Sequence, residues 1–358
     1  MEGTSDAILA FLSATLICWA TVPAAELLAR RVGAIDTPGP RSQHTTPTPR
    51  MSGVAILAGI EIAGWIWLPT NNEVTAILLG AVAVALVGAL DDIFDLPALV
   101  KLIGQAAGAS IPVIAGVRPD ALTIPFIGGF ELGWTAYPLT IIGIVAVINI
   151  INLIDGIDGL AAGVIAIAAT AMAVIALSLD RNEAGVLAAI TAGGALGFLR
   201  HGFPPASSFM GDTGSNLLGY MIAIVSIQGA LKTNAVVALA FPLVILAVPI
   251  FDTAFVVAKR LKYHQPIYQA DRWHFHHRMA NIGFSQRRTL AYLYGWTLVL
   301  AGLALALRLV PYSDDRGHFD PAWTIFMVAV ILAAVGVTIY LVYVLEIIKG
   351  PRARSGPE

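Results

Sequence analysis

The residues most suited to chemistry are aspartates in short motifs between apolar stretches. The first motif, LDDIFDL (90–96), contains the adjacent pair Asp91 and Asp92. Adjacent side chains on a helix point about 100° apart. The two carboxylates could therefore serve different partners, such as a metal-bound phosphate and a nucleophilic oxygen. The alternative is an acidic loop that faces water.

A second motif places three polar residues at steps of three. In NIINLIDGIDGL (149–160) these are Asn152, Asp155 and Asp158. On a helix such steps bring side chains to neighbouring positions of one face. The intervening glycines allow a backbone or a phosphate to approach closely. The alternative is a helix end whose polar groups face water.

The third motif, FMGDTGS (209–215), is a glycine-bounded turn that leads into an apolar segment. Asp212 offers a hard oxygen ligand that suits Mg²⁺. Thr213, Ser215 and the free amides at the start of the following helix suit an anion. An ordinary helix N-cap would use the same residue types, so a cap is the alternative.

Histidines form the fourth cluster, in HFHHRM (274–279). His274, His276 and His277 have a spacing that resembles a zinc site, which would need a further ligand in fixed geometry. Arginines nearby, among them Arg260, favour an anionic ligand instead, because the guanidinium fork matches phosphate oxygens. A solvated loop is the alternative.

Together these motifs predict Mg²⁺-assisted phosphoryl transfer. Carboxylates would hold the metal, and the metal would neutralise a diphosphate. Arg, Lys and His side chains would stabilise the charge that moves to the leaving group.

The elements that must position these motifs are membrane-spanning helices. Of the 358 residues, 57% are hydrophobic and only 12% are charged, whereas a soluble domain averages about a quarter charged. The mean hydropathy is +0.79. This composition argues against a soluble enzyme, a disordered chain and a nucleic-acid-binding protein. The single cysteine, Cys18, excludes a disulfide framework and a Cys-based metal site.

A helical span needs about 20 mostly apolar residues, and the chain offers eleven such segments. They cover approximately 7–29, 53–69, 73–90, 98–117, 136–154, 160–179, 184–199, 214–231, 234–258, 290–309 and 322–346. The sequence therefore predicts an all-α polytopic membrane protein, with residues 1–358 forming one integral membrane domain. Since at least one substrate of a membrane enzyme is expected in the membrane, this favours a lipid substrate.

The distribution of Lys and Arg predicts the orientation, because these residues stay cytoplasmic in short loops. With the N-terminus outside, sixteen of them lie on the inner side and five on the outer side. The C-terminal tail, 347–358, and the loop 259–289 with the histidines are then cytoplasmic. The segment 118–134 is too short to span, and its β-type runs around a Gly-Gly pair predict an external hairpin. The acidic motifs reach one common cytoplasmic level.

These motifs resemble a known family, the polyprenyl-phosphate N-acetylhexosamine-1-phosphate transferases (glycosyltransferase family 4). The similarity covers nearly the whole chain, and the joint order of its motifs is highly specific. The motifs are DTPGPRSQHTTPTPR (36–50), DDIFD (91–95), KLIGQ (101–105), NIINLIDGIDGLAAG (149–163), FPPASSFMGDTGSNLLG (203–219) and DRWHFHH (271–277). The resemblance implies transfer of a sugar-1-phosphate from a UDP-N-acetylhexosamine to undecaprenyl phosphate. UMP would leave, with Mg²⁺ (or Mn²⁺ in its place) at a cytoplasmic cleft of the bacterial inner membrane.

The resemblance also assigns roles to individual residues. Asp212 resembles the principal Mg²⁺ ligand, and Asp91 and Asp92 resemble the aspartate pair that handles the lipid phosphate. Lys101 resembles the lysine that faces phosphate. The remaining assignments concern the nucleotide sugar, and they comprise Asn152, Asp155 and Asp158 along the cleft and Arg260, His274, His276 and His277 at the diphosphate and sugar. The resemblance is also compatible with a homodimer.

Two details separate the branches of this family. The peptidoglycan branch, which transfers phospho-MurNAc-pentapeptide, has three consecutive histidines and a lysine that closes the first Asp motif. Here the corresponding residues are His-Phe-His-His and Asp95. The pattern is similar to the GlcNAc-1-phosphate branch, which starts cell-envelope glycans such as O-antigen, enterobacterial common antigen, teichoic acid or arabinogalactan. Ser52 departs from the family, which often has the first Gly of a pair at this position.

Two other classes of protein remain as alternatives. A cation-coupled secondary transporter would show inverted repeats and charges near the bilayer midplane, and the sequence shows no repeat. An intramembrane zinc hydrolase would have a ligand set such as HExxH, which this sequence lacks.

Overall fold

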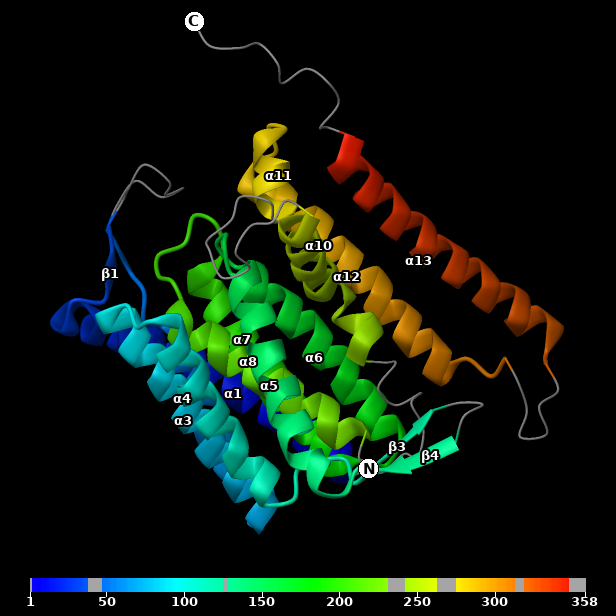
Figure 1. Cartoon of the computed structure of the whole chain (residues 1–358), viewed down its shortest axis with the longest axis horizontal. Helices are drawn as coiled ribbons and strands as arrows, with labels where there is room; N and C mark the ends of the chain where they lie inside the picture. Colours follow the sequence, from blue (N-terminus) through cyan, green and yellow to red (C-terminus); the bar gives the residue numbers. More distant parts are fainter. Residues whose placement is uncertain are drawn as a thin grey trace, which may run out of the picture.

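The computed structural model describes residues 2–37, 47–124, 128–230, 242–262, 275–312 and 319–347. Long apolar helices dominate the described chain (Figure 1). In order they are α1 (Glu2–Val32), α2 (Gly53–Trp67), α3 (Asn72–Phe94), α4 (Ala98–Ile114), α5 (Ala136–Ile154), α6 (Leu160–Ser178), α7 (Asn182–Gly202), α8 (Gly211–Ala230), α10 (Ala247–Lys262), α11 (Phe275–Asn281), α12 (Gln286–Leu309) and α13 (Pro321–Ile347).

Seven helices in the described residues are long and apolar enough to cross a membrane, and α2 and α4 are shorter apolar helices. The chain is thus an all-α polytopic membrane protein. Part of the predicted span 234–258 lies outside the described residues. The number of spans and their orientation stay predictions.

Small residues allow the helices at the centre to pack closely. α7 packs against α1 and α6, and α8 packs against α3 and α5. A Cβ added at Gly193 of α7 would lie 2.4 Å from the carbonyl oxygen of Phe11, and one at Gly197 would lie 2.4 Å from that of Thr15. A pair of glycines four residues apart lets two helix backbones touch, as in other membrane proteins. Figure 1 shows α13 at the periphery, beside α12.

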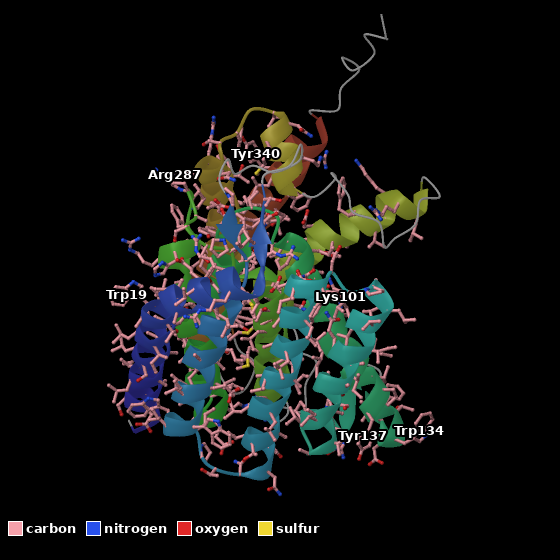
Figure 2. All side chains as sticks on the ribbon, turned by 90° about the vertical axis from the view of Figure 1, so that its left-hand side faces the viewer. Trp19, Lys101, Trp134, Tyr137, Arg287 and Tyr340 are labelled. Carbon is pink, nitrogen blue, oxygen red and sulfur yellow. The ribbon has the colours of Figure 1, made fainter. Side chains whose placement is uncertain are left out.

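Two short antiparallel strand pairs accompany the helices. β1 (Ile35–Asp36) pairs with β2 (Thr48–Pro49). β3 (Ala121–Ile124) pairs with β4 (Gly128–Glu131) within the segment for which the sequence predicts a hairpin. Figure 2 shows Trp134 and Tyr137, which follow β4, at one end of the helices and Arg287 near the other end. That β3 and β4 lie outside the membrane stays a prediction.

Two helices, α2 and α3, converge on the start of α8. A Cβ at Gly53 of α2 would lie 2.1 Å from the amide nitrogen of Gly214. One at Gly88 of α3 would lie 2.4 Å from the carbonyl oxygen of Asp212. Only glycine permits such backbone contact. The fold therefore brings the second and third helices directly onto the GDTGS turn.

Candidate active site

Lys101 joins the first and third aspartate motifs. Its Nζ donates hydrogen bonds to Oδ2 of Asp91 and to Oδ2 of Asp212, each at 2.6 Å. The second oxygen of Asp91 accepts the backbone N–H of Leu96 at 2.7 Å. Residues from α3, α4 and α8 thus form one cluster, in which a single ammonium offsets two carboxylates. Sequence resemblance had linked Lys101 to phosphate, and the structure adds that it lies between the two aspartates.

Asp92 has a different set of partners, since both of its carboxylate oxygens face the start of α8. Oδ1 accepts the N–H of Asp212 at 2.9 Å. Oδ2 accepts the N–H of Thr213 at 3.0 Å and its hydroxyl at 2.6 Å. The amides that the sequence suggested for a substrate anion therefore bind the chain's own carboxylate. That part of the prediction is wrong for these two amides, because both already donate hydrogen bonds to the carboxylate of Asp92 from α3.

The residues just before α2 also contact this junction, at which α3 meets the start of α8. Arg50 donates from Nε and Nη2 to the carbonyl oxygen of Asp92, at 3.1 and 2.8 Å. Next to it, the hydroxyls of Ser52 and Ser208 lie 2.5 Å apart in the buried interior. The departure of Ser52 from the family pattern thus has a local reason, because Ser208 supplies a partner for its hydroxyl.

A cavity of about 390 Å³ opens beside this junction. Its wall combines carboxylates, two side-chain amides, one arginine, glycines and a few apolar side chains. It is lined by Asp36, Arg50, Asp92, Asn152, Asp155, Gly156, Ile157, Asp158, Gly159, Phe198, Gly202, Ser208, Phe209, Met210, Gly211, Asp212 and Gln286. Segments separated by up to 250 residues therefore meet at one surface, which has room for part of a nucleotide.

The second motif supplies one side of the cavity and also ties it to its neighbours. Asn152 Nδ2 donates to Ser215 Oγ of α8 at 2.8 Å. Asp158 Oδ2 accepts the N–H of Ala206 at 3.1 Å. Asp155 lies between them and is half-buried. Burial, and then the negative charges of Asp212, Asp92 and Asp158, raise the pKa of the Asp155 carboxyl well above its usual range.

The histidine motif is only partly described. His274 lies outside the described residues, while His276 and His277 belong to α11. Asp252 of α10 accepts the N–H of Phe275 at 2.7 Å and so ties α11 to α10. Arg260 is buried in α10 and is not among the residues that line the cavity. The predicted contact of these four residues with the nucleotide sugar stays a prediction.

Several residues of the site had no role assigned to them from the sequence. Arg50 ends the first resembling motif, and Ser208 and Phe209 lie within the fifth, so membership of a motif was the available signal. Asp36 and Gln286 also line the cavity. Gln286 stands outside every motif, and only the packing of α12 brings it here.

The oxygen ligands of the cavity fit a hard cation such as Mg²⁺. Mg²⁺ commonly takes one or two protein carboxylates and completes its shell with water and substrate phosphates. Asp212 and Asp155 are neighbouring carboxylates, and a bound cation would offset the charge repulsion that adds to burial in raising the pKa of Asp155. Within the described residues no group of three His, Cys, Asp or Glu side chains forms a ready-made metal site. The substrate would therefore supply part of the shell.

Several known proteins have sequences similar to that of this chain. Residues 74–230 match the family model described as Glycosyl transferase family 4. A probable undecaprenyl-phosphate N-acetylglucosaminyl 1-phosphate transferase of Bacillus subtilis is 40% identical over 303 residues, which are 83% of this chain and 84% of the relative. A decaprenyl-phosphate N-acetylglucosaminephosphotransferase of Mycobacterium leprae is 34% identical over 81% of each chain. A phospho-N-acetylmuramoyl-pentapeptide-transferase of Desulforudis audaxviator is 32% identical over 76% of this chain and 88% of the relative.

Proposed function

Because the chain belongs to glycosyl transferase family 4, the polyprenyl-phosphate N-acetylhexosamine-1-phosphate transferases, we propose that it transfers N-acetylglucosamine-1-phosphate from UDP-N-acetylglucosamine to undecaprenyl phosphate. The observation that carries this proposal is the Asp91–Lys101–Asp212 cluster beside a cavity lined by five aspartates. Such a site suits two phosphate-bearing substrates. The relatives whose names specify N-acetylglucosamine supply the choice of sugar.

In the proposed reaction one phosphorus–oxygen bond forms and one breaks. An oxygen of the lipid phosphate attacks the sugar-bearing phosphorus of the donor, and the bond to the UMP oxygen breaks. UMP leaves with the electron pair of that bond. The products are UMP and a lipid that carries the sugar through a diphosphate.

Lys101 and Asp91 are the residues that we assign to the lipid phosphate. The ammonium of Lys101 attracts the phosphate, and movement of Lys101 toward it would release Asp91 and Asp212 from their 2.6 Å hydrogen bonds. Asp91 then accepts any proton that the lipid phosphate carries. The attacking oxygen would thereby be fully ionised when it meets the donor.

Asn152, Asp155 and Asp158 form the donor side of the proposed site. Their motif lines the cavity together with Phe209 and Gly211. When bound at Asp212 and Asp155, Mg²⁺ (or Mn²⁺) would neutralise the diphosphate of the donor and make UMP a better leaving group. Arg260, His274, His276 and His277 are proposed to contact the diphosphate and sugar. We place the reaction at the cytoplasmic face of a bacterial inner membrane, with a homodimer as the proposed assembly.

Asp92 is proposed to hold the start of α8 in place rather than to attack the substrate. Both of its oxygens already accept hydrogen bonds from Asp212 and Thr213. A carboxylate so engaged is a poor nucleophile, because attack would require breaking these charge-assisted bonds. This favours direct displacement by the lipid phosphate over a covalent enzyme intermediate.

A substitution at Thr213 tests the role of Asp92. Thr213→Val removes the 2.6 Å hydroxyl bond to Asp92 while keeping the side-chain volume. We expect a loss of about 1.5–3 kcal/mol of stabilisation at the start of α8 and a lower kcat. Thr213→Ser should restore both. The measurements are thermal unfolding and steady-state kinetics.

Combining the substitutions separates anchoring from direct chemistry. If Asp92 acts through α8, then Asp92→Asn and Thr213→Val disrupt the same contact, and the double variant is less impaired than the product of the two single losses. If Asp92 itself attacks the substrate, Asp92→Asn alone abolishes turnover, whatever residue 213 is. That outcome would contradict the anchoring role.

The proposed reaction is tested by UMP release from purified protein. With undecaprenyl phosphate and Mg²⁺ present, UDP-N-acetylglucosamine should yield UMP and a lipid-linked sugar diphosphate. A panel that includes UDP-MurNAc-pentapeptide and other UDP-N-acetylhexosamines identifies the sugar. Turnover of the pentapeptide donor alone would move the chain to the peptidoglycan branch. Lack of UMP release from any donor would contradict the transferase assignment.

Cysteine labelling tests the predicted orientation. Cys18 is buried and is the only cysteine, so an introduced cysteine reports its own accessibility. We expect Ala280→Cys on α11 and Glu131→Cys on β4 to react with a membrane-impermeant maleimide from opposite sides of sealed vesicles. Both positions are exposed. Reaction of both from the same side would contradict the predicted topology.

A further inference from the structure

A second cavity, of about 590 Å³, lies beside the loop that follows α7. The end of α7, the residues after it and the first turn of α12 line this cavity. None of the residues proposed for the transfer reaction lines it. The transfer reaction therefore does not account for the residues that line this second cavity.

The polar lining of this cavity favours an anion. Arg200, His201 and Arg287 line it, and no carboxylate does. Both arginines are exposed, and neither forms an ion pair with a carboxylate in the described part of the chain. Among the described residues, Arg287 donates from Nε alone, to the carbonyl oxygen of Pro204 at 3.1 Å. Three nitrogen-bearing side chains with no acidic residue in the wall suit phosphate oxygens.

His201 adds a buried donor to the same wall. Its Nε2 is covered by surrounding atoms and has no hydrogen-bond partner among the residues that the structure describes. A covered polar atom without a partner is costly unless a ligand or water satisfies it. With its proton on Nε2 and its ring turned toward the cavity, the imidazole would donate to a ligand phosphate. Ser207, whose N–H and hydroxyl bond to the carbonyl oxygen of His201, fixes the neighbouring backbone.

Apolar side chains next to the cations indicate that the ligand is a lipid. Leu196 and Phe203 line the same cavity, and each is 41% exposed. Arg287 lies toward the end of the molecule away from Trp134 (Figure 2). In the predicted topology this is the cytoplasmic boundary of the membrane. A pocket with cations at the headgroup level and apolar residues toward the acyl chains is typical of anionic phospholipid sites.

We propose that this cavity binds the phosphate headgroup of an anionic membrane phospholipid. Arg200, His201 and Arg287 contact the phosphate, and the acyl chains lie along Leu196 and Phe203. The inference is independent of which sugar the protein transfers. Lipid binding would also affect the transfer site. Residues up to Ser207 line the second cavity, and residues 208–211, which follow directly, line the cavity of the transfer site. A bound lipid would therefore hold the loop that leads to Asp212.

Lipid titration tests the proposal with the full-length protein. The purified chain, held in micelles that contain phosphatidylcholine, is titrated with phosphatidylglycerol, and native mass spectrometry counts the retained lipids. We expect one tightly retained phosphatidylglycerol per chain. Arg200→Gln should weaken its binding about tenfold, the loss expected for one charge-assisted hydrogen bond. Arg200 forms no internal ion pair in the described residues, so this variant should fold normally.

Arg288→Gln is the matched control, because Arg288 is exposed next to Arg287 but does not line the cavity. It should bind phosphatidylglycerol like the parent protein. Equal losses in Arg200→Gln and Arg288→Gln would overturn the site, as would equal retention of phosphatidylcholine and phosphatidylglycerol. Displacement of the lipid by millimolar inorganic phosphate would assign the cavity to a soluble anion. Displacement by UDP-N-acetylglucosamine or undecaprenyl phosphate would assign it to a substrate. Either displacement would overturn the proposal.

Discussion

Replacement of Asp212 by asparagine should lower turnover by at least about a thousandfold, which corresponds to about 4 kcal/mol in the activation free energy. Asparagine keeps the shape of the side chain but removes the anionic oxygen that the proposed Mg²⁺ site needs. It also removes the charge that pairs with Lys101 at 2.6 Å. The loss should appear in kcat, because the metal acts mainly on charge that develops in the transition state.

The fold should survive this substitution. The amide of Asp212, which bonds to Asp92, belongs to the backbone and is retained. Asp120→Asn is a suitable control, because that aspartate is exposed near β3 and pairs only loosely with Arg118, at 3.8 Å. The measurements are UMP release over a range of Mg²⁺ concentrations and thermal unfolding of both variants. Near-normal activity of Asp212→Asn at ordinary Mg²⁺ would contradict its role as a ligand.

Replacement of Lys101 by methionine should lower kcat about a hundredfold to a thousandfold, the usual cost of losing one donor that stabilises charge in the transition state; here the lost donor is the proposed contact with the lipid phosphate. The same change should strengthen Mg²⁺ binding. Lys101 neutralises Asp91 and Asp212, so its removal leaves two carboxylates close together without a cation. A metal ion would then bind to a more negative site.

These opposite effects distinguish a role in catalysis from a role in folding. Titration calorimetry with Mg²⁺ measures the affinity, and UMP release measures kcat. Lys101→Arg should keep much of the charge compensation, although its planar fork fits the two carboxylates differently. If Lys101→Met instead loses Mg²⁺ affinity together with activity and thermal stability, Lys101 is structural and the proposed contact with phosphate is wrong.

The contacts of Asp91 and Asp92 show which features of the site could be predicted from the local sequence. Adjacent aspartates on a helix must point in different directions, so separate partners for Asp91 and Asp92 follow from the helix geometry alone. The partners themselves do not follow. Lys101 lies ten residues after Asp91, but Thr213 lies 121 residues after Asp92. The amides at the start of α8 could have been free for a substrate anion or occupied by a side chain of the protein. The contact with Asp92, which is distant in the sequence, decides for the second.

The sequence by itself determined the class of protein, because an apolar segment of about 20 residues has few stable states other than a membrane-spanning helix. It also determined the family, through six motifs in order. Only the tertiary structure decided how the motifs meet. Gly53 and Gly88 let α2 and α3 touch the start of α8, and their close approach places Asp92 on the amides of Asp212 and Thr213. A glycine in the sequence permits such contact, but its partner cannot be predicted from the sequence, because the partner depends on how whole helices pack.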